Sequence, residues 1–234
     1  MNERAQAAPP LRGAKDSRRK AGSILLDLGL VVLTLLAYVP ALRAGFIWDD
    51  QMFVTDNKAY HSVEGLRQIW LEPRANPHYY PLLLTVFWAM YRLWGVQPFG
   101  YHLVTLLFHV TGALLLRRLL TRLRVPGAAF GAFLFALHPV YVSSVAWVTE
   151  LKNTMSGFFY LAALLIWFGK EQGSEIADPV AGAKPALLGR AGFISAMSSW
   201  CGLSLLCFAS ALLSKTTTVS FLLAVPLIEW WRWG

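Results

Sequence analysis

The sequence predicts an all-α fold, a polytopic helical membrane protein with about six transmembrane helices. Of its 234 residues, 56% are hydrophobic, and the mean hydropathy is +0.47. The apolar residues fall in long blocks separated by short charged segments, a distribution that a water-soluble core does not need. The formal net charge of +8 resides in residues that flank these blocks. The charge therefore indicates membrane topology, and we expect no nucleic-acid partner.

Six apolar segments of about 15 to 22 residues account for the predicted spans, although the third and fourth are short. The third is expected to continue as an interfacial helix. A basic tail, residues 1–22, precedes the first segment. We interpret the first segment as an uncleaved signal anchor rather than a secretory signal, because Leu42-Arg43-Ala44 is a poor cleavage site. The six segments are Ser23–Leu42, Phe99–Leu116, Pro126–Leu137, Thr154–Phe168, Phe193–Leu213 and Thr217–Trp231.

The distribution of positive charge predicts the topology. With the amino terminus inside, 14 of the 21 Lys and Arg residues fall in cytoplasmic segments, which is the asymmetry that the positive-inside rule requires. Both termini are then cytoplasmic, and residues 170–190, rich in Gly, Ala and Pro, form a flexible cytoplasmic connector. The outward segments are a long first loop, residues 43–98, then residues 138–153 and a tight turn at residues 214–216.

Both outward segments are expected to contain interfacial helices. The first loop is too long and too aromatic to be a simple connector. Its second half, His78–Gly95, is amphipathic around Arg92 and rich in Tyr and Trp, as is typical of a helix at the membrane interface. The segment His138–Asn153 begins with the helix breaker Pro139 and mixes apolar with charged residues. It predicts a second interfacial helix.

Two adjacent acids in the first loop are the leading candidates for chemistry. Asp49 and Asp50 lie within the apolar segment FIWDDQMFVTDN, Phe46 to Asn57, where partial desolvation would raise the pKa of a carboxyl group toward values useful for a general base. A solvated turn after a helix is the alternative. Further polar residues share the outward side, although each alone also fits a snorkelling or capping role. They are His78, Arg92, His138, Glu150, Lys152 and Lys215.

Carboxylates gathered with basic groups at an interface suit a reaction on an anionic lipid headgroup, in which cations hold phosphate and a carboxylate takes a proton. A metal site made from Asp49, Asp50, His78, His138 and Glu150 is the less favoured alternative, because their spacing matches no metal-ligand signature. We therefore predict no metal and no cofactor.

Polar residues within the spans favour packing over transport. His102 and His109 are seven residues apart and share one helix face, where they are expected to line a helix contact. A transporter, which usually needs ionisable groups near the midplane, is a third hypothesis. Cys201 and Cys207 lie on different faces of one helix and cannot pair with each other within it.

Four ordered blocks carry a family resemblance: FIWDDQMFVTDN, HYYPLLLTVFWAMYRLWGVQPFGYHLVTLLFHVTGALLL, FALHPVYVSSVAWVTELKNTMSGFFYLAALL and ALLSKTTTVSFLLAVPLIEWW. They resemble the membrane half of bacterial tetratricopeptide-repeat membrane proteins related to the animal transmembrane and tetratricopeptide-repeat O-mannosyltransferases. The resemblance implies a GT-C glycosyltransferase fold in a bacterial inner membrane, with residues 23–234 as a partial domain. It also implies a polyprenyl-phosphate-linked sugar as donor and a protein Ser or Thr hydroxyl as acceptor, with inversion at the anomeric carbon.

The resemblance also assigns roles to residues. Asp49 or Asp50 would be the catalytic base and Glu150 a second acid of the site. The lipid phosphate would be held by basic residues among His78, Arg92, His138, Lys152 and Lys215, of which Arg92, Lys152 and Lys215 fit best by charge.

The chain departs from the family pattern at two positions and in its extent. Tyr80 stands where the animal relatives have Arg, and Leu151 where many bacterial relatives have Arg, so a phosphate contact is expected to be absent or moved. The chain also has no 34-residue helical repeat, and a further polypeptide is expected to complete the fold. The rival hypothesis is a non-catalytic membrane module that anchors a repeat scaffold or binds lipid or partners.

Overall fold

The computed structural model describes residues 12–74, 78–169 and 190–233. Within these ranges all regular secondary structure is helical, which confirms the all-α prediction. Four helices are long: α1 (Arg12–Tyr38), α4 (Pro98–Arg122), α7 (Leu151–Trp167) and α9 (Arg190–Ser214). The shorter ones are α2 (Val63–Leu71), α3 (Pro81–Trp94), α5 (Ala128–Leu137), α6 (Val142–Ala146) and α10 (Phe221–Trp233).

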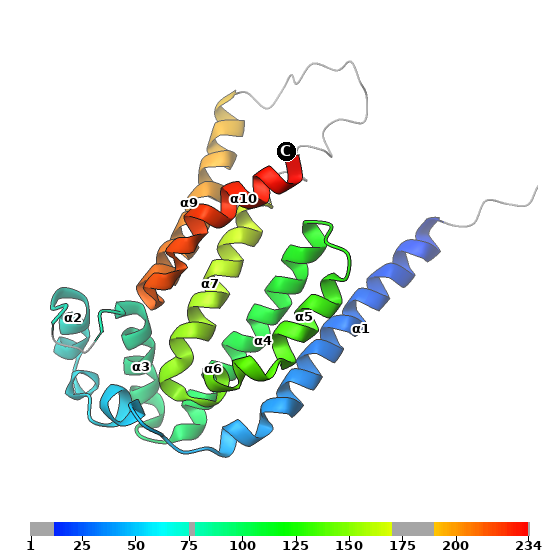
Figure 1. Cartoon of the computed structure of the whole chain (residues 1–234). Coiled ribbons are helices and arrows are strands. Elements are labelled where there is room, and N and C mark those ends of the chain that lie inside the picture. The colour runs from blue at the N-terminus through cyan, green and yellow to red at the C-terminus, as the bar shows by residue number, and fades with distance from the viewer. Residues whose placement is uncertain (1–11, 75–77, 170–189, 234) are drawn as a thin grey trace, which may run out of the picture.

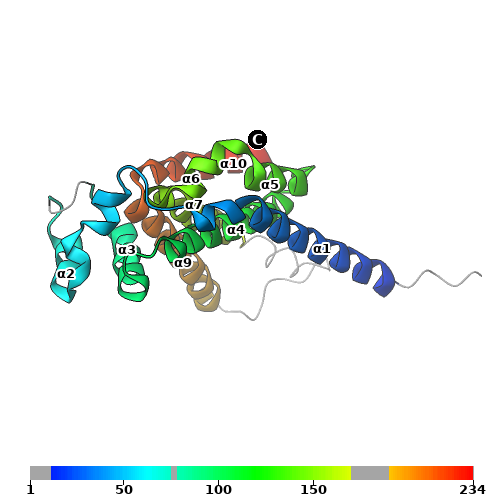
Figure 2. The same cartoon turned by 90° about the horizontal axis from the view of Figure 1, so that it is seen from below.

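The long helices stand side by side in a row (Figure 1). Helix α4 packs against α1 and α5 on one side and against α7 on the other, and α7 packs in turn against α9. Helices α2 and α3, from the first loop, lie together at one end of the row, as both views show (Figure 2). The row thus has one end to which the first loop adds a small helical layer.

Two helical segments in the described residues are long and apolar enough to cross a membrane, Lys20–Arg43 and Pro98–Arg122. Helix α5 and the next helical segment, Pro139–Ala146, are bent by 46° relative to each other, and they make a third span if the two count as one. Helices α7 and α10 have 17 and 13 residues, which at 1.5 Å per residue rise about 25 and 20 Å, less than a hydrocarbon core of about 30 Å. The structure therefore supports two or three candidate spans.

Large apolar side chains face outward along the row. In α1 these include Leu25, Leu28 and Leu36, and in α10 Leu223 and Trp230, all of them more than half exposed. Such contiguous apolar faces are unusual on a soluble monomer. They are the surface expected of helices in contact with lipid.

The first loop packs into a core that it shares with α4 and α7. It contains the π-helical turn η2 (Gln51–Thr55) and the 3-10 turn η3 (Lys58–His61) as well as α2 and α3. Phe53, Tyr60 and Phe87 are buried together with residues of α4 and α7. Burial raises the pKa of the Tyr60 phenol above its usual value, so the neutral hydroxyl donates to the carbonyl of Phe53 at 2.7 Å. The prediction that this loop is more than a connector is confirmed.

The predicted helix at His78–Gly95 corresponds to α3, which begins at Pro81, a residue favoured at the first helical position. The single helix predicted over His138–Asn153 is wrong. The chain forms a 3-10 turn (Pro139–Tyr141), the short α6 and a second 3-10 turn (Val148–Glu150) before α7 begins. Trp147 is extended, and the Thr149 N–H is bonded to a distant side chain instead of a helical carbonyl.

The predicted basic tail and cytoplasmic connector fall mostly outside the described residues. Residues 12–22 of the tail form the first turns of α1, while residues 1–11 lie outside. Of the connector, residues 170–189 lie outside, and α9 begins at Arg190. The fifth predicted span corresponds to α9, and the sixth to the 3-10 turn η6 (Thr216–Ser220) followed by α10.

Candidate functional site

The candidate acids sit in a tight turn, Ile47–Asp50, which we call the acid turn. The Asp50 N–H donates to the Ile47 carbonyl, and the Ile47 N–H donates to Asp50 Oδ2, each at 3.0 Å. Trp48, at the corner, has φ +49°, a left-handed conformation that costs a residue other than glycine about 1 kcal/mol or more. Such strain persists only where the surrounding structure holds it in place.

Asp50 holds the acid turn against the start of α7. Its side chain is fully buried. Oδ1 accepts hydrogen bonds from both the N–H and the hydroxyl of Thr149, 99 residues away, and Oδ2 accepts from Ile47. Because both oxygens are engaged by three donors, Asp50 fixes the relative position of two chain segments.

Asp49 differs from its neighbour. One of its carboxylate oxygens, Oδ1, is buried and has no hydrogen-bond partner among the described residues. The indole N–H of Trp147 is also buried without a partner there, and the ring of Trp147 packs edge-on against Trp48 at 5.0 Å. Buried polar groups ordinarily have hydrogen-bond partners. An unpaired acceptor and an unpaired donor thus lie on the two segments that Asp50 joins.

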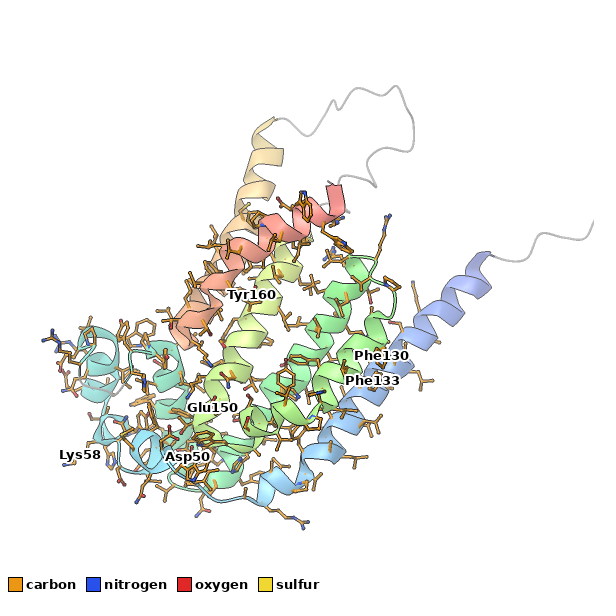
Figure 3. The ribbon with its side chains drawn as sticks, in the orientation of Figure 1. Asp50, Lys58, Phe130, Phe133, Glu150 and Tyr160 are labelled. Carbon is orange, nitrogen blue, oxygen red and sulfur yellow. The ribbon has the colours of Figure 1, made fainter. Side chains whose placement is uncertain are left out.

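A polar cluster lies directly after these segments at the start of α7. Glu150 forms an ion pair with Lys152 at 2.7 Å and accepts a hydrogen bond from the Asn153 amide. The amide oxygen of Asn153 accepts from the ammonium of Lys215, and its nitrogen also donates to Ser144 at 3.0 Å. We call Ser144, Glu150, Lys152, Asn153 and Lys215 the Glu150 cluster. Figure 3 shows Asp50 and Glu150 at the same end of the helical row.

Three predicted site residues lie outside this network. His78 is exposed and stacks between Phe53 and Tyr80, at 5.8 and 5.6 Å between ring centroids. Arg92 donates to the carbonyl of His61 at 3.3 Å. His138 uses its own Nδ1 to cap the turn that follows, accepting from the Val140 N–H. No hydrogen bond or ion pair within the described residues joins these three side chains to the acids.

The two departures from the family pattern have structural explanations. Leu151 is fully buried in the core that the first loop shares with α7, so a charged side chain there would lack water. Tyr80 is partly buried and packs flat against His78, with 3° between the ring planes. Neither position points a cation at the acid turn.

Three residues of the site were missed by the sequence reasoning: Ser144, Thr149 and Asn153. Asn153 follows Glu150 by three residues, a spacing that places two side chains together in a first helical turn, and this signal was available. The Thr149 contact with Asp50 spans 99 residues, and no local pattern encodes it.

An aromatic cavity of about 270 Å³ adjoins the Glu150 cluster. Ser144 and Asn153 form part of its wall, which otherwise comes from α4, α5, α7 and the 3-10 turn Pro139–Tyr141 and includes Phe108, Phe135 and Tyr160. Gly112 and Gly157 also line it, and a methyl group added at either would meet no atom within 4 Å. The cavity is thus apolar, with its polar edge at the cluster.

The remaining predictions concern metals and histidines. Among the described residues, no three His, Cys, Asp or Glu side chains are grouped so that they could hold a metal ion. His109 bonds the carbonyl of Ala136 at 3.0 Å and packs against Tyr38 and Phe135, so it lines a contact of α4 with α1 and α5 as expected. His102 is buried beside the backbone of residues 44 and 45.

Comparison with known proteins gives a consistent group of relatives. The chain is 30% identical to the human protein O-mannosyl-transferase TMTC3 over 152 residues, which is 60% of this chain and 17% of the relative. It is 30% identical to protein O-mannosyl-transferase F38B6.6 of Caenorhabditis elegans over 172 residues, 68% of this chain and 25% of the relative. With protein O-mannosyl-transferase Tmtc3 of Drosophila melanogaster it shares 28% over 184 residues, 65% of this chain and 20% of the relative.

The chain therefore spans a quarter or less of the length of these relatives. No protein-family model and no solved structure matches it. The agreement of the relatives' names and the extent of the matched segments nevertheless support one conclusion. Over about two thirds of its length, the chain is a homologue of the TMTC protein O-mannosyl-transferases.

Proposed function

We propose that the chain is a membrane glycosyltransferase module that transfers a sugar from a polyprenyl-phosphate donor to a hydroxyl group of a protein. The observation that carries the proposal is the buried, unpartnered oxygen of Asp49, whose neighbour Asp50 is bonded to Thr149 immediately before Glu150. The homology to protein O-mannosyl-transferases supports the same class of reaction. The acceptor is a Ser or Thr side chain, and mannose is the sugar that the relatives' names suggest.

Asp49 is the proposed base, because its Oδ1 is free to accept a proton whereas both oxygens of Asp50 are already bonded. In the reaction, the acceptor hydroxyl gives its proton to Asp49 as its oxygen attacks the anomeric carbon. The new carbon–oxygen bond forms as the bond from that carbon to the phosphate oxygen breaks, with inversion. The lipid phosphate leaves with the electron pair of the broken bond.

We assign the stabilisation of the leaving phosphate to Lys152 and Lys215. Glu150 and Asn153 hold the two ammonium groups in one cluster, so less side-chain entropy is lost when they bind an anion. The aromatic cavity that adjoins the cluster is the proposed site for the first part of the isoprenoid chain. His78, Arg92 and His138 are assigned no contact with the phosphate.

The finer architecture belongs to the same proposal. A GT-C-like domain with about six membrane segments would place the acid turn and the Glu150 cluster on the outward side and both termini in the cytoplasm. A bacterial inner membrane as the location, a second polypeptide segment that completes the fold, and a reaction without metal or other cofactor stay predictions.

The test is sugar transfer from mannosyl-phosphoryl polyprenol to an acceptor peptide by membranes that contain the complete protein. Asp49→Asn should lower the transfer rate at least 100-fold, the usual contribution of a general base, while donor binding persists. Asp56→Asn is the matched control, because Asp56 is exposed in the same loop and its carboxylate accepts from the Thr55 hydroxyl at 3.1 Å. Undiminished transfer by Asp49→Asn would refute the assignment of the base.

A second variant addresses the donor. Gly157→Leu projects a side chain into the aromatic cavity, and it should raise the KM for the lipid donor about tenfold or more while leaving the kcat within a few-fold. Gly157→Ala, which adds one methyl group in open space, should change the KM much less. Equal effects of the two substitutions would place the isoprenoid chain elsewhere.

The rival function is a non-catalytic membrane module that binds lipid or anchors a repeat scaffold. It predicts that the wild-type protein binds the lipid donor without transferring its sugar, and that Asp49→Asn leaves binding and complex formation unchanged. Transfer that depends on Asp49 excludes this rival.

A further inference from the structure

A second site lies at the opposite end of α4 from the acid turn. His102 of α4 is near Asp50, and Arg117 follows fifteen residues later, which at 1.5 Å per residue places it about 22 Å farther along the helix. Here a pocket of about 430 Å³ opens between α1, α4 and α7. In Figure 1 it corresponds to the amino-terminal half of α1 and the carboxyl-terminal ends of α4 and α7. Its lining residues are Ser23, Asp27, Arg117, Arg118, Thr121, Arg122 and Leu165.

The pocket has an excess of positive charge. Three guanidinium groups line it, and Asp27 is the single carboxylate among the lining residues. Arg117 is buried and holds both oxygens of Asp27 at 2.7 Å and the Ser23 hydroxyl at 3.1 Å. The pair neutralises itself, so the net charge of the pocket comes from Arg118 and Arg122.

These two arginines are engaged to different degrees. Arg122 donates to two carbonyls at the end of α7, those of Leu165 at 3.4 Å and Gly169 at 3.1 Å, and both bonds leave its positive charge uncompensated. Arg118 is exposed and has no hydrogen bond or ion pair with any described residue. A pocket of this size, with one guanidinium fixed and one free to close on a ligand, offers bidentate donors to an oxyanion.

We propose that this pocket binds a phosphate-bearing anion, either the headgroup of an anionic phospholipid or a free phosphate compound. Basic pockets between membrane helices bind acidic lipid headgroups for this reason, and the apolar outer face of α1 beside the pocket would accommodate acyl chains. The site is separate from the proposed sugar transfer, since it shares no residue with the acid turn or the Glu150 cluster.

The experiment uses the full chain purified in an uncharged detergent. Native mass spectrometry measures the bound fraction of phosphatidylglycerol and of phosphatidylcholine, and thermal unfolding at constant ionic strength measures the response to inorganic pyrophosphate. We expect a preference for phosphatidylglycerol, a rise in melting temperature with pyrophosphate, or both. A response to the lipid alone identifies a headgroup site, and a response to pyrophosphate identifies a site open to free phosphate compounds.

Two variants and a control locate the binding. Arg118→Gln should weaken anion binding about tenfold, the value of one charge-assisted contact. Thr121→Phe should weaken it without any change of charge, by filling the pocket. Arg124→Gln removes an exposed positive charge from the same end of the molecule but does not line the pocket, and it should stay within twofold of the wild type.

Three results would overturn the proposal. One is equal binding of the two lipids with no response to pyrophosphate. Another is an equal loss in Arg118→Gln and Arg124→Gln, which would indicate surface charge rather than a site. The third is unchanged binding in Thr121→Phe at an unchanged melting temperature.

Discussion

Two adjacent like charges lie near each end of α4, and the two pairs are built alike. At one end Asp50 is buried and bonded to three donors, while Asp49 keeps an oxygen without a described partner. At the other end Arg117 is buried and bonded to Asp27, while Arg118 has no bond to any described residue. In each pair one charge holds chain segments together, and the other leaves at least one polar atom without a partner among the described residues. Sequence adjacency alone does not reveal which member does which.

The largest expected effect comes from Asp50→Ala. The change removes the acceptor of three hydrogen bonds, two of them from Thr149, which is fully buried. Because each orphaned buried donor costs about 1–3 kcal/mol, the free energy of unfolding should fall by about 3–5 kcal/mol. Unfolding in mixed micelles with an increasing fraction of SDS, followed by tryptophan fluorescence, measures the loss.

Asp49→Ala is the matched control. It removes a carboxylate whose Oδ1 has no described partner, so the stability should stay within about 0.5 kcal/mol of the wild type or rise. A loss in Asp49→Ala as large as that in Asp50→Ala would show that the two acids share one structural role, and the proposed division between them would be wrong.

The second comparison is Arg117→Leu with Arg118→Leu. Arg117→Leu leaves the Asp27 carboxylate, about a quarter exposed, without its partner, and it should cost about 2–3 kcal/mol, somewhat less than a fully buried broken pair. Arg118→Leu should cost less than about 0.5 kcal/mol, as is usual for an exposed side chain without partners. The same SDS titration measures both.

A double variant separates loss of the ion pair from loss of packing. Adding Asp27→Leu to Arg117→Leu removes the stranded charge, and it should restore most of the lost stability, because well-packed apolar residues often replace a buried pair at little cost. If the double variant is as unstable as Arg117→Leu, the arginine acts through packing alone.

Sequence reasoning was sufficient for the helices and insufficient for these pairings. Apolar blocks and the positions of proline predict α3 and the start of α4 to within a few residues. Helix α1 begins eleven residues before its predicted span, and α4 ends six residues after its own. The prediction failed at residues 138–153. There the Thr149 N–H bonds to Asp50 instead of continuing a helix, a long-range contact that overrides local propensity.

The candidate site was predicted in the same uneven way. The distribution of Lys and Arg predicted that Glu150, Lys152 and Lys215 share the outward side of the membrane. The structure joins them in one cluster. The same distribution also assigned His78 and His138 there, but His78 stacks on Phe53 and Tyr80, and His138 caps the turn that follows it. Topology predicts the end of the bundle at which a residue lies, whereas side-chain packing decides which residues meet.

The last prediction tests whether the acid turn and the basic pocket are independent of each other. Gly65, in the first turn of α2, would place an added methyl group 1.9 Å from the Ala59 carbonyl oxygen, so Gly65→Ala should cost about 1–3 kcal/mol through a backbone shift. Hydrogen exchange should accelerate in residues 58–71 and stay unchanged near Arg117. Gly22→Ala in α1 meets no atom within 4 Å and should instead stabilise the helix by up to about 1 kcal/mol. Faster exchange near Arg117 in Gly65→Ala would mean that the first loop and the basic pocket unfold as one unit, because a local clash in the loop then reaches the far end of α4.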